Sequence, residues 1–417
     1  MDYGRANLQN PFMALAQELR EDSKVEIVSS APGGRDLSID YLRTTLTLLV
    51  LAHHSSLAYT SWAHFNREHI FLSTAPIVDT TRWAFFDYAE NFNDVFFMSL
   101  MFLVSGLFVY PALRKHGTLR FLRDRLLRLG VPFVFAVTLL MPIAYYASWQ
   151  LSDRNAGFFD FYERLALAGF AAGPPWFVWV LLFFDVVLAL ALAPFQLAVP
   201  LAERSMRSLR RHTIAAVCGA FVLSAITYLP MLKMYGFGTW SQFLTSPLSF
   251  QVSRIGLYAL WFLFGFLIGG TGLNDGILSR EGSLARHWPL WVAACILAYN
   301  ALWFVPKCPL LHGLSTLTQG AIEATLWVGS CVMSSVGFLA FFRGASLQAR
   351  SWMLSLSKSA YVMYLVHYVY ITWMQRLLLY RPIPAALKFL FVFLTTTLLS
   401  WLTAQCLLRI PKLKNIL

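Results

Sequence analysis

Residues 95–112 read VFFMSLMFLVSGLFVYPA, a run of 18 positions without a charged side chain. A hydrophobic run of this length is typical of a helix that crosses a lipid bilayer. The next segment, residues 114–128, carries six basic side chains: Arg114, Lys115, Arg120, Arg123, Arg125 and Arg128. Because basic residues beside an apolar helix favour its cytoplasmic end, this stretch predicts both a helical membrane protein and the orientation of one of its helices.

The composition of the whole chain agrees with a membrane protein. Of its 417 residues, 58% are hydrophobic and 13% are charged, and the mean hydropathy is +0.58. Soluble domains carry about 25% charged residues, so this chain has too few to cover a surface in water, and a soluble cytoplasmic enzyme is excluded. The lysines and arginines lie between apolar segments, so the formal charge of +12 indicates membrane topology, with lipid and not nucleic acid as the partner.

We predict an all-α protein with about ten transmembrane helices, each near the 20 residues that cross the hydrocarbon layer. Residues 1–34 are polar and do not place a basic start before an apolar core, so we expect a cytoplasmic segment and not a cleaved signal peptide. Residues 35–417 are expected to form the integral membrane domain. The expected spans are about 42–62, 95–112, 129–149, 174–199, 212–232, 250–272, 288–305, 320–342, 359–379 and 385–409.

The connections between these spans predict their orientation. Lys and Arg concentrate in the even-numbered connections, so we expect both termini in the cytoplasm. The longest outer connection, residues 63–94, is acidic and aromatic. It is long enough to fold over the mouth of a pore, and a plain solvated loop is an equal alternative.

Ionisable residues inside the spans are candidate functional groups, because burying them in lipid is costly. Arg43 and His54 are 11 residues apart, about three helical turns, and so lie on one face of the first span. His54 can take up and return a proton near neutral pH. The alternative is that His53 or His54 hydrogen-bonds a neighbouring helix; His53 points about 100° away from His54 around the helix.

A second candidate is the pair Arg125 and Arg128 at the entrance of the third span. Residues three apart are neighbours on a helix face, and two guanidinium groups together suit a phosphorylated ligand. The alternative, favoured by charge alone, is that these arginines serve topology or bind anionic lipid.

Several weaker signals remain. Ser105-Gly106 lies deep in the second span, where a small residue commonly serves helix packing. Trp176 belongs to an aromatic stretch typical of a membrane interface, and His367 is a second intramembrane imidazole. No pair of cysteines has metal-ligand spacing, so we expect neither a metal nor a bound cofactor. Four further acidic residues have no assigned role: Asp40, Asp94, Asp185 and Glu323.

Taken in order, these elements resemble the acyltransferase-3 family of polytopic membrane acyltransferases, from about Arg35 to the end of the chain. Each element is weak alone, but five in the same order with ten spans form a specific pattern. They are the Arg43-to-His54 spacing, Ser105-Gly106, Arg125 and Arg128 before Pro132, Trp176-Phe177, and Tyr364-Leu-Val-His367.

The resemblance implies an O-acyltransferase of a bacterial inner membrane. It would move an acetyl, succinyl or similar acyl group from cytoplasmic acyl-CoA to a hydroxyl of an envelope carbohydrate or glucan. His54 would be the general base or proton shuttle and Arg43 would tune or orient it. Arg125 and Arg128 would bind the CoA phosphates, and we expect Ser105, Trp176 and His367 to contact substrate.

Within the family, the chain looks similar to the branch of periplasmic glucan succinyltransferases, through the His54-Ser-Ser-Leu-Ala-Tyr59 segment and its basic C-terminus. The main alternative is a secondary transporter or flippase of an envelope precursor, since ten spans with ionisable residues at mid-membrane suit transport as well. No internal symmetry between two halves of the chain favours it. A membrane sensor without catalytic activity is a third possibility.

Overall fold

The computed structural model describes residues 36–152, 157–192, 212–241, 247–414 and 416. Within these residues the chain is helical and contains no β-strand, which confirms the expected all-α class. The principal helices are α2 (Leu37–Ser56), α3 (Phe85–Gly106), α4 (Val109–His116), α5 (Thr118–Arg125), α6 (Val131–Phe135), α7 (Met141–Trp149), α8 (Phe158–Ala168), α9 (Trp176–Leu192), α11 (Thr213–Tyr235), α12 (Ile255–Thr271), α13 (Ser283–Arg286), α14 (Trp288–Phe304), α15 (Thr316–Gly344), α16 (Ser351–Leu378), α17 (Ala385–Leu407) and α18 (Pro411–Lys414).

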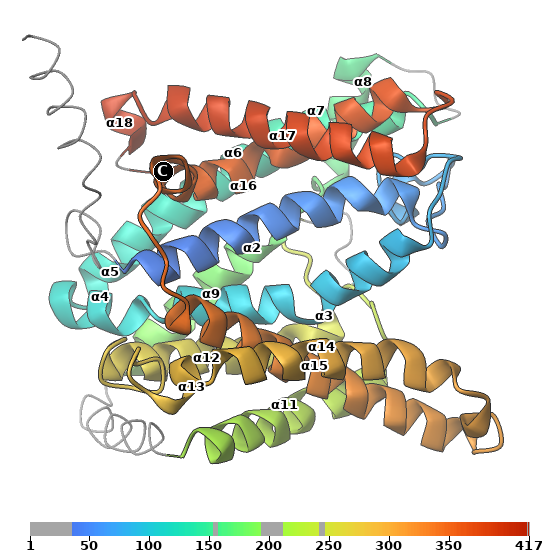
Figure 1. The fold of residues 1–417 in the computed structure, drawn as a ribbon. Coiled ribbons are helices and arrows are strands. Elements are labelled where there is room, and N and C mark those ends of the chain that lie inside the picture. The colour runs from blue at the N-terminus through green and yellow to red at the C-terminus, as the bar shows by residue number, and fades with distance from the viewer. Residues whose placement is uncertain (1–35, 153–156, 193–211, 242–246, 415, 417) are drawn as a thin grey trace, which may run out of the picture.

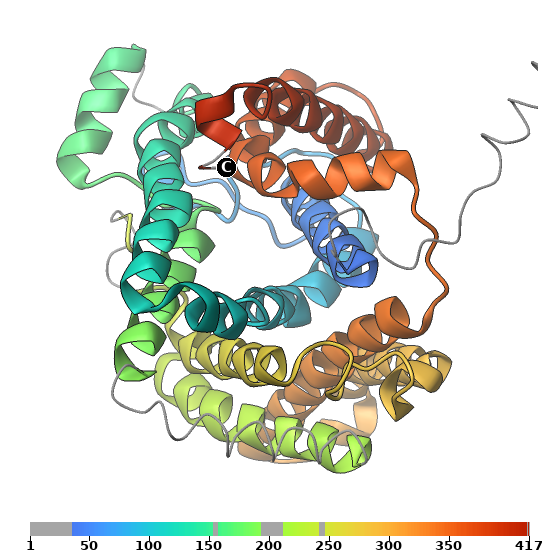
Figure 2. The ribbon, with the colours of Figure 1, turned by 90° about the vertical axis from the view of Figure 1, so that its left-hand side faces the viewer.

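The long helices run side by side along one direction (Figure 1), and an end-on view shows them as a bundle (Figure 2). Helix α2 packs against four others, α3, α15, α16 and α17. It is therefore a central element, and 14 of its 20 residues are buried.

Helices occupy all ten segments in which spans were expected, and seven helical segments are long and apolar enough to cross a membrane. Those seven are Phe85–His116, Thr118–Trp149, Thr213–Tyr235, Val252–Thr271, Trp288–Lys307, Thr316–Gly344 and Ala385–Leu407. Helix α9 is apolar but shorter, and the rest of its expected span lies outside the described residues. The count of ten spans remains a prediction.

The two remaining helices, α2 and α16, fall short in hydropathy because they carry polar side chains. On α2 these include Asp40 and His53, and on α16 His367 and Gln375, and all four side chains are buried. Both helices thus turn polar groups toward the protein interior, as expected of helices that build a functional site in a membrane.

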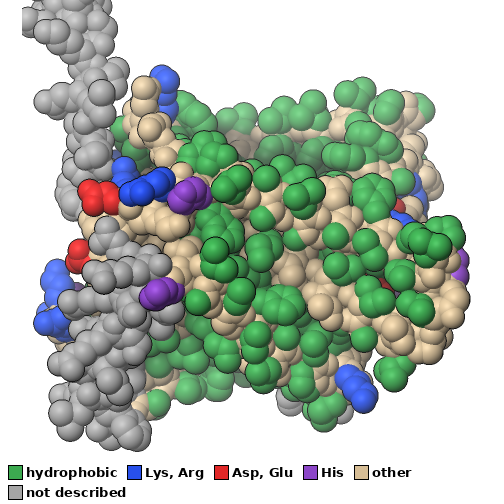
Figure 3. Space-filling model, turned by 60° about the horizontal axis from the view of Figure 1, so that its bottom comes forward, with side chains coloured by type: hydrophobic (Ala, Val, Ile, Leu, Met, Phe, Trp, Pro, Cys, Tyr) green, Lys and Arg blue, Asp and Glu red, His purple; other side chains and the backbone are tan. Residues whose placement is uncertain are grey.

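Many hydrophobic side chains are exposed on the surface of the bundle. Figure 3 shows them across one face of the molecule, where charged side chains are few. On α17, Leu394, Leu398 and Leu402, spaced one turn apart, are each more than 40% exposed. Exposed apolar side chains in such number fit contact with lipid.

The basic stretch 114–128 differs from its prediction as a loop. It is helical on both sides of Gly117, where φ is +72° and the chain reverses between α4 and α5. Glycine adopts this backbone conformation at little cost. The α4–α5 corner lies at the end of the molecule where α2 and α16 begin and α17 ends (Figure 1). That this end faces the cytoplasm stays a prediction.

The predicted cytoplasmic segment, residues 1–34, lies outside the described part of the chain.

The outer connection also differs from its predicted bounds, because α3 begins at Phe85, ten residues before the expected span. The connecting segment, residues 57–84, folds against the bundle. Its Asp79 forms an ion pair with Lys388 at the start of α17, 2.7 Å long and buried on both sides. The Arg82 guanidinium donates to the carbonyls of Thr60 and Ser61. Residues 57–84, between α2 and α3, are therefore a folded segment and not a plain solvated loop.

Close packing of α3 on α12 explains one weak sequence signal. A Cβ atom on Gly106 would lie 2.2 Å from the carbonyl oxygen of Phe262, and one on Gly265 would lie 1.9 Å from that of Leu103. Neither position leaves room for a side chain. Gly106 thus serves helix packing, as small residues commonly do in membranes, while its neighbour Ser105 is free to face elsewhere.

Candidate functional site

A cavity of about 510 Å³ lies among α2, α3, α4, α5, α9 and α16. Four of the predicted site residues line it: Arg43, Ser105, Arg125 and Arg128. The chain brings them together from three different helices and a turn. Because α4 and α5 close one side of it, the cavity lies toward the end of the bundle that carries the α4–α5 corner (Figure 1).

The charge of the cavity wall suits an anion. Among its described lining residues are three arginines, one histidine, His116, and one carboxylate, Asp124. Apolar and aromatic side chains, including Phe177 and Leu181 of α9, form much of the remaining wall. Such a wall can hold a ligand with a polyanionic end and an apolar end.

The arginine pair sits beside a widened helical turn. Pro132 has no N–H, so the carbonyl of Arg128 cannot accept the usual hydrogen bond from four residues ahead. The turn over Leu126–Gly130 is a π-helix, and the hydroxyl of Tyr361 donates to the Arg128 carbonyl at 2.8 Å. Turns of this kind often occur at functional sites. The contact ties the backbone of the arginine pair to α16.

Arg125 is held from two sides. Its Nε lies 3.2 Å from Oδ2 of Asp185 on α9, and its guanidinium carbon lies 5.0 Å from the ring centre of Phe121. Asp185 is completely buried, and a buried carboxylate needs a cation beside it to stay charged. The ion pair gives Asp185 a partner that the sequence alone did not assign, and it leaves the two terminal nitrogens of Arg125 for other contacts.

Arg43 is exposed, and its guanidinium carbon lies 5.7 Å from the ring centre of Phe108. One turn before it, Asp40 is buried. Of the two residues predicted to share one face of α2, Arg43 lines the cavity, together with Thr47, and His54 does not.

The hydroxyl of Ser105 donates to the carbonyl of Met101 in its own helix at 2.8 Å. No histidine or carboxylate of the described residues forms a hydrogen bond with it. A nucleophilic serine normally has such a base as its neighbour. This geometry favours Ser105 as a wall residue over Ser105 as a nucleophile.

His54 and His367 are not among the residues that line the cavity; they form a second layer with His53. The ring of His54 lies 5.3 Å from that of His53, 5.4 Å from that of His367 and 5.1 Å from that of Tyr368, between centroids. His54 is partly exposed, and His367 is completely buried. The structure therefore brings the two predicted imidazoles together, from helices that are far apart in the sequence.

This pairing follows from the register of α2 and α16. Near their first turns, the hydroxyls of Thr44 and Ser357 are 2.7 Å apart. Ten residues further along both helices, His54 meets His367. Beyond them, the amide of Gln375 donates to the carbonyl of His54 at 3.1 Å. Two polar contacts thus fix the depth and rotation of the His54 segment against α16.

Tyr364 connects the cavity to the imidazole layer. Its side chain lines the cavity and its hydroxyl donates to the carbonyl of Pro174, before α9. Its own carbonyl accepts a hydrogen bond of 2.5 Å from Nδ1 of His367, one turn further along α16. The two layers are therefore adjacent on one helix.

Trp176 does not line the cavity, although Phe177 and Val178 beside it do. Its ring packs near Trp240 at 5.5 Å and Tyr258 at 5.8 Å, between centroids. Its prediction as a substrate contact stays untested.

The two remaining carboxylates differ in their surroundings. Asp94 on α3 forms a bidentate ion pair with Arg254 before α12, with distances of 2.9 and 2.6 Å. Nearby on α3, the carboxylate of Glu90 lies 3.6 Å from Nε2 of His53. Glu323 is exposed on α15.

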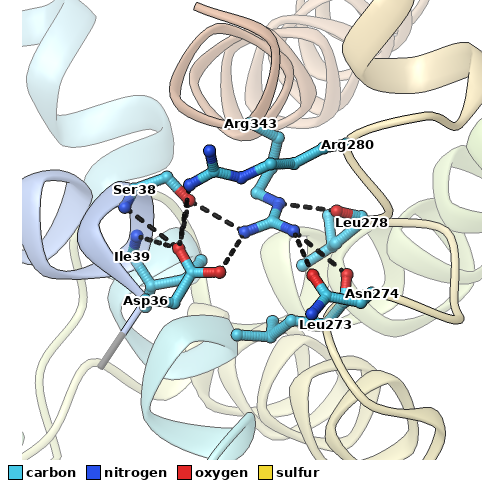
Figure 4. Close-up of polar contacts among 8 residues, drawn as sticks. All are labelled: Asp36, Ser38, Ile39, Leu273, Asn274, Leu278, Arg280 and Arg343. Carbon is cyan, nitrogen blue, oxygen red and sulfur yellow. Dashed lines mark hydrogen bonds and ion pairs between the residues drawn. The ribbon is translucent and has the colours of Figure 1, made fainter. Parts of the chain in front are cut away.

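A separate polar cluster fixes the start of α2 (Figure 4). Arg343 at the end of α15 is completely buried at its side chain and donates to Asp36 at 2.5 Å, to Ser38 at 2.9 Å and to the carbonyl of Leu278 at 2.6 Å. Burial raises the pKa of Asp36, but the Ser38 hydroxyl and the Arg343 guanidinium outweigh burial and hold that pKa below its usual value. Asp36 also caps α2 by accepting from the Ser38 amide.

Sequence reasoning missed the residues that hold the predicted groups in place. These are the Asp36–Arg343 pair, Tyr361 and Gln375. Arg343 has the same sequence signal as the other cations at the ends of spans, so its burial could not be distinguished. Tyr361 and Gln375 lie on α16 and act through contacts with segments more than 200 residues away. No local pattern encodes such contacts.

The chain is similar to known proteins over most of its length. The family model Acyl_transf_3, described as an acyltransferase domain, matches residues 36–405. A protein named glucans biosynthesis protein C from Salmonella schwarzengrund (strain CVM19633) is 24% identical over 278 residues, 65% of this chain and 67% of the relative. Its counterpart from Salmonella heidelberg (strain SL476) is 24% identical over 281 residues, with the same coverage. That from Salmonella paratyphi B is 31% identical over 118 residues, 27% of each chain. No solved structure matches the chain.

Proposed function

The chain belongs to the acyltransferase-3 family, and from this premise we propose that it transfers an acyl group from cytoplasmic acyl-CoA to a hydroxyl of an envelope carbohydrate or glucan. Membership makes the chain a membrane acyltransferase and sets aside the transporter and the sensor. The donor, the acyl group, the acceptor and the inner membrane of a bacterium are parts of the proposal.

The cationic cavity is the observation that carries the proposed donor. CoA thioesters are polyanionic at the nucleotide end and carry the acyl group at the end of a long arm. Arg43, Arg125 and Arg128 line one cavity, and guanidinium groups form charge-assisted hydrogen bonds with phosphate oxygens. We place the phosphates at Arg125 and Arg128, with the arm pointing along α2 and α16 toward His54.

His54 is the proposed general base, as the family resemblance implied. It takes the proton of the acceptor hydroxyl while the oxygen attacks the thioester carbon. The new bond is the ester C–O bond, the C–S bond breaks, and the thiolate takes up a proton as CoA. Since the Ser105 hydroxyl is engaged with its own helix, direct transfer without an acyl-enzyme intermediate is the simpler route.

The proposed acceptor comes from the opposite side of the bundle, where the folded segment of residues 57–84 lies. The relatives named above are glucans biosynthesis proteins, which supports a glucan. Succinyl and acetyl groups are both candidates, because the names of the relatives specify no acyl group.

Labelled acyl transfer tests this function. Protein purified in detergent is incubated with radiolabelled acetyl- or succinyl-CoA and envelope glucan, and label in the glucan is measured. Mass spectrometry of envelope carbohydrate from cells with and without the protein then identifies the acyl group and the acceptor. Label in the glucan is expected only when the protein is present. The His54→Ala variant, incubated with the same labelled donor, is the control and should transfer far less label. Envelope carbohydrate of identical mass in both cells would contradict the proposal.

A further inference from the structure

Two buried ring nitrogens belong to adjacent imidazoles of α2 and α16. Nδ1 of His54 and Nε2 of His367 are both buried, and neither has a hydrogen-bond partner within the described residues, as is also true of Nδ1 of His53. Their rings lie 5.4 Å apart with an angle of 35° between the planes. An unpaired polar atom in an apolar interior is costly, so two such atoms on adjacent rings call for an explanation.

The tautomer of His367 is fixed by its other nitrogen. Nδ1 lies 2.5 Å from the carbonyl oxygen of Tyr364, and a carbonyl can only accept, so Nδ1 carries the proton. In the neutral ring, Nε2 then has the free electron pair and can only accept a hydrogen bond. His367 thus presents a fixed acceptor toward His54.

We propose that His367 is a positioning residue for His54, its Nε2 accepting a hydrogen bond from Nδ1–H of His54. Two imidazoles joined by one such bond have centroids roughly 5 Å apart. The observed centroids are 5.4 Å apart, but the two nitrogens do not form this bond in the structure, so the proposal requires a small rotation of one ring. This inference rests on the proposed function, in which His54 is the general base. It gives His367 a role other than the substrate contact expected from the sequence.

The consequence for catalysis concerns the tautomer of His54. With its proton held on Nδ1, the electron pair of His54 is on Nε2, the nitrogen that then takes the proton of the acceptor hydroxyl. When Nε2 takes the hydroxyl proton, the ring becomes a cation, and Nε2 of His367 stabilises it through the same hydrogen bond. The carbonyl of Tyr364, His367 and His54 form an ordered series that orients the base, as the third group of a catalytic triad does.

The surroundings of the pair are compatible with this role. Tyr368 packs edge-on against His54 at 5.1 Å, and Gln375 holds the His54 carbonyl. His53, the other imidazole beside His54, has its Nε2 directed at Glu90. Nδ1 of His53 is also buried without a partner, so His53 competes for Nδ1 of His54. His367 is favoured because its Nδ1 is bound to Tyr364 and its Nε2 can therefore only accept.

Kinetics of single and double variants test the proposal with labelled acyl-CoA and glucan. His367→Phe keeps a ring but removes the acceptor, so kcat is expected to fall about 100-fold while the KM for acyl-CoA changes little. His367→Gln restores an oxygen acceptor and is expected to recover at least about tenfold of that loss. In a His54→Ala background, His367→Phe should cause no further loss, because the residue acts through His54.

His312→Phe is the matched control, since it makes the same change at an exposed histidine outside the imidazole layer and the cavity, and its kcat is expected to stay within about threefold of the unmodified protein. The proposal is overturned if His367→Phe keeps normal kcat while His54→Ala is inactive. It is also overturned if His367→Phe raises the KM alone, or if its loss is the same with and without His54. An active His54→Ala variant would instead refute the base role in the proposed function. Should His367→Phe fail to fold, the Gln variant decides: a kcat lowered by at most about tenfold supports the proposal, and a loss near 100-fold contradicts it.

Discussion

The cavity and the imidazole layer lie next to each other on α2 and α16, yet they differ in almost every physical respect. The cavity is open enough to leave Arg43 and Arg128 exposed, and guanidinium groups of three arginines line it. In the imidazole layer, His367 is completely buried, and its neighbours are aromatic and imidazole rings. The first suits the recognition of a polyanion and the second suits the controlled transfer of a proton.

Under the proposed function, this difference separates donor binding from proton transfer along one pair of helices. Tyr364 belongs to both layers, since its side chain lines the cavity and its carbonyl binds His367. Substitutions in the two layers should therefore affect different kinetic constants, and each prediction below examines that separation.

The largest effect is expected for His54→Ala. Loss of a general base lowers turnover by about 10² to 10⁴, so kcat should fall in that range, while the KM for acyl-CoA should change little. Steady-state transfer of labelled acyl groups measures both constants. An equal change in both constants would mean that the two layers do not have separate tasks.

The ion pair between Asp79 and Lys388 should hold residues 57–84 against α17 without involving the cavity. Lys388→Met leaves a buried carboxylate without its cation, which costs about 3–5 kcal/mol, so the temperature of unfolding in detergent should drop strongly. Adding Asp79→Asn should recover much of the stability, because the uncompensated charge is then gone. Lys358→Met, an exposed lysine of α16, is the control and should change little. A drop of similar size for both lysines would rule out a specific role of the pair.

Removal of the arginine pair examines the donor side. Arg125→Ala together with Arg128→Ala should raise the KM for acyl-CoA at least about tenfold, because two charge-assisted hydrogen bonds to phosphate are lost, with a smaller change in kcat. The matched control is Arg120→Ala with Arg123→Ala, which removes the same charge from exposed positions of α5 outside the cavity. If both double variants behave alike, the pair serves topology or lipid binding, as charge alone suggested.

The smallest effect is expected at Asp36, which holds the start of α2 and so the depth of both layers. At pH 7, Asp36→Asn should lower the free energy of unfolding by about 2 kcal/mol, since the buried Arg343 loses a charge-assisted hydrogen bond. Because the folded pKa of Asp36 is below its usual value, this stabilisation is present above about pH 4 and is lost as pH falls through the folded pKa. Thermal unfolding of the two proteins should therefore converge at acid pH. A constant difference at all pH values would contradict the assignment.

The sequence was informative about composition, helical spans and charged groups. Arg43, Ser105, Arg125 and Arg128 were expected to belong to one site, and the structure places all four around one cavity. The family resemblance implied this grouping, whereas the residues alone favoured helix packing for Ser105-Gly106 and topology or lipid binding for Arg125 and Arg128.

The remaining features depend on contacts between distant segments. The pairing of His54 with His367 needs the register of α2 and α16, which the hydroxyls of Thr44 and Ser357 and the amide of Gln375 help to set. The helical form of the basic stretch 114–128 was missed because its charges suggested a solvated loop. The exposure of Glu323 was missed because hydropathy does not distinguish the lipid-facing side of a helix from its buried side.

Binding of donor in the absence of turnover tests the separation of the two layers most directly. Equilibrium dialysis of radiolabelled acyl-CoA against purified His54→Ala protein measures binding, and transfer to glucan is measured on the same sample. The account predicts a dissociation constant within about twofold of the unmodified protein, since a base outside the cavity contributes little to donor affinity, together with transfer reduced at least about 100-fold. Loss of donor binding together with transfer, or transfer at the normal rate, would contradict it.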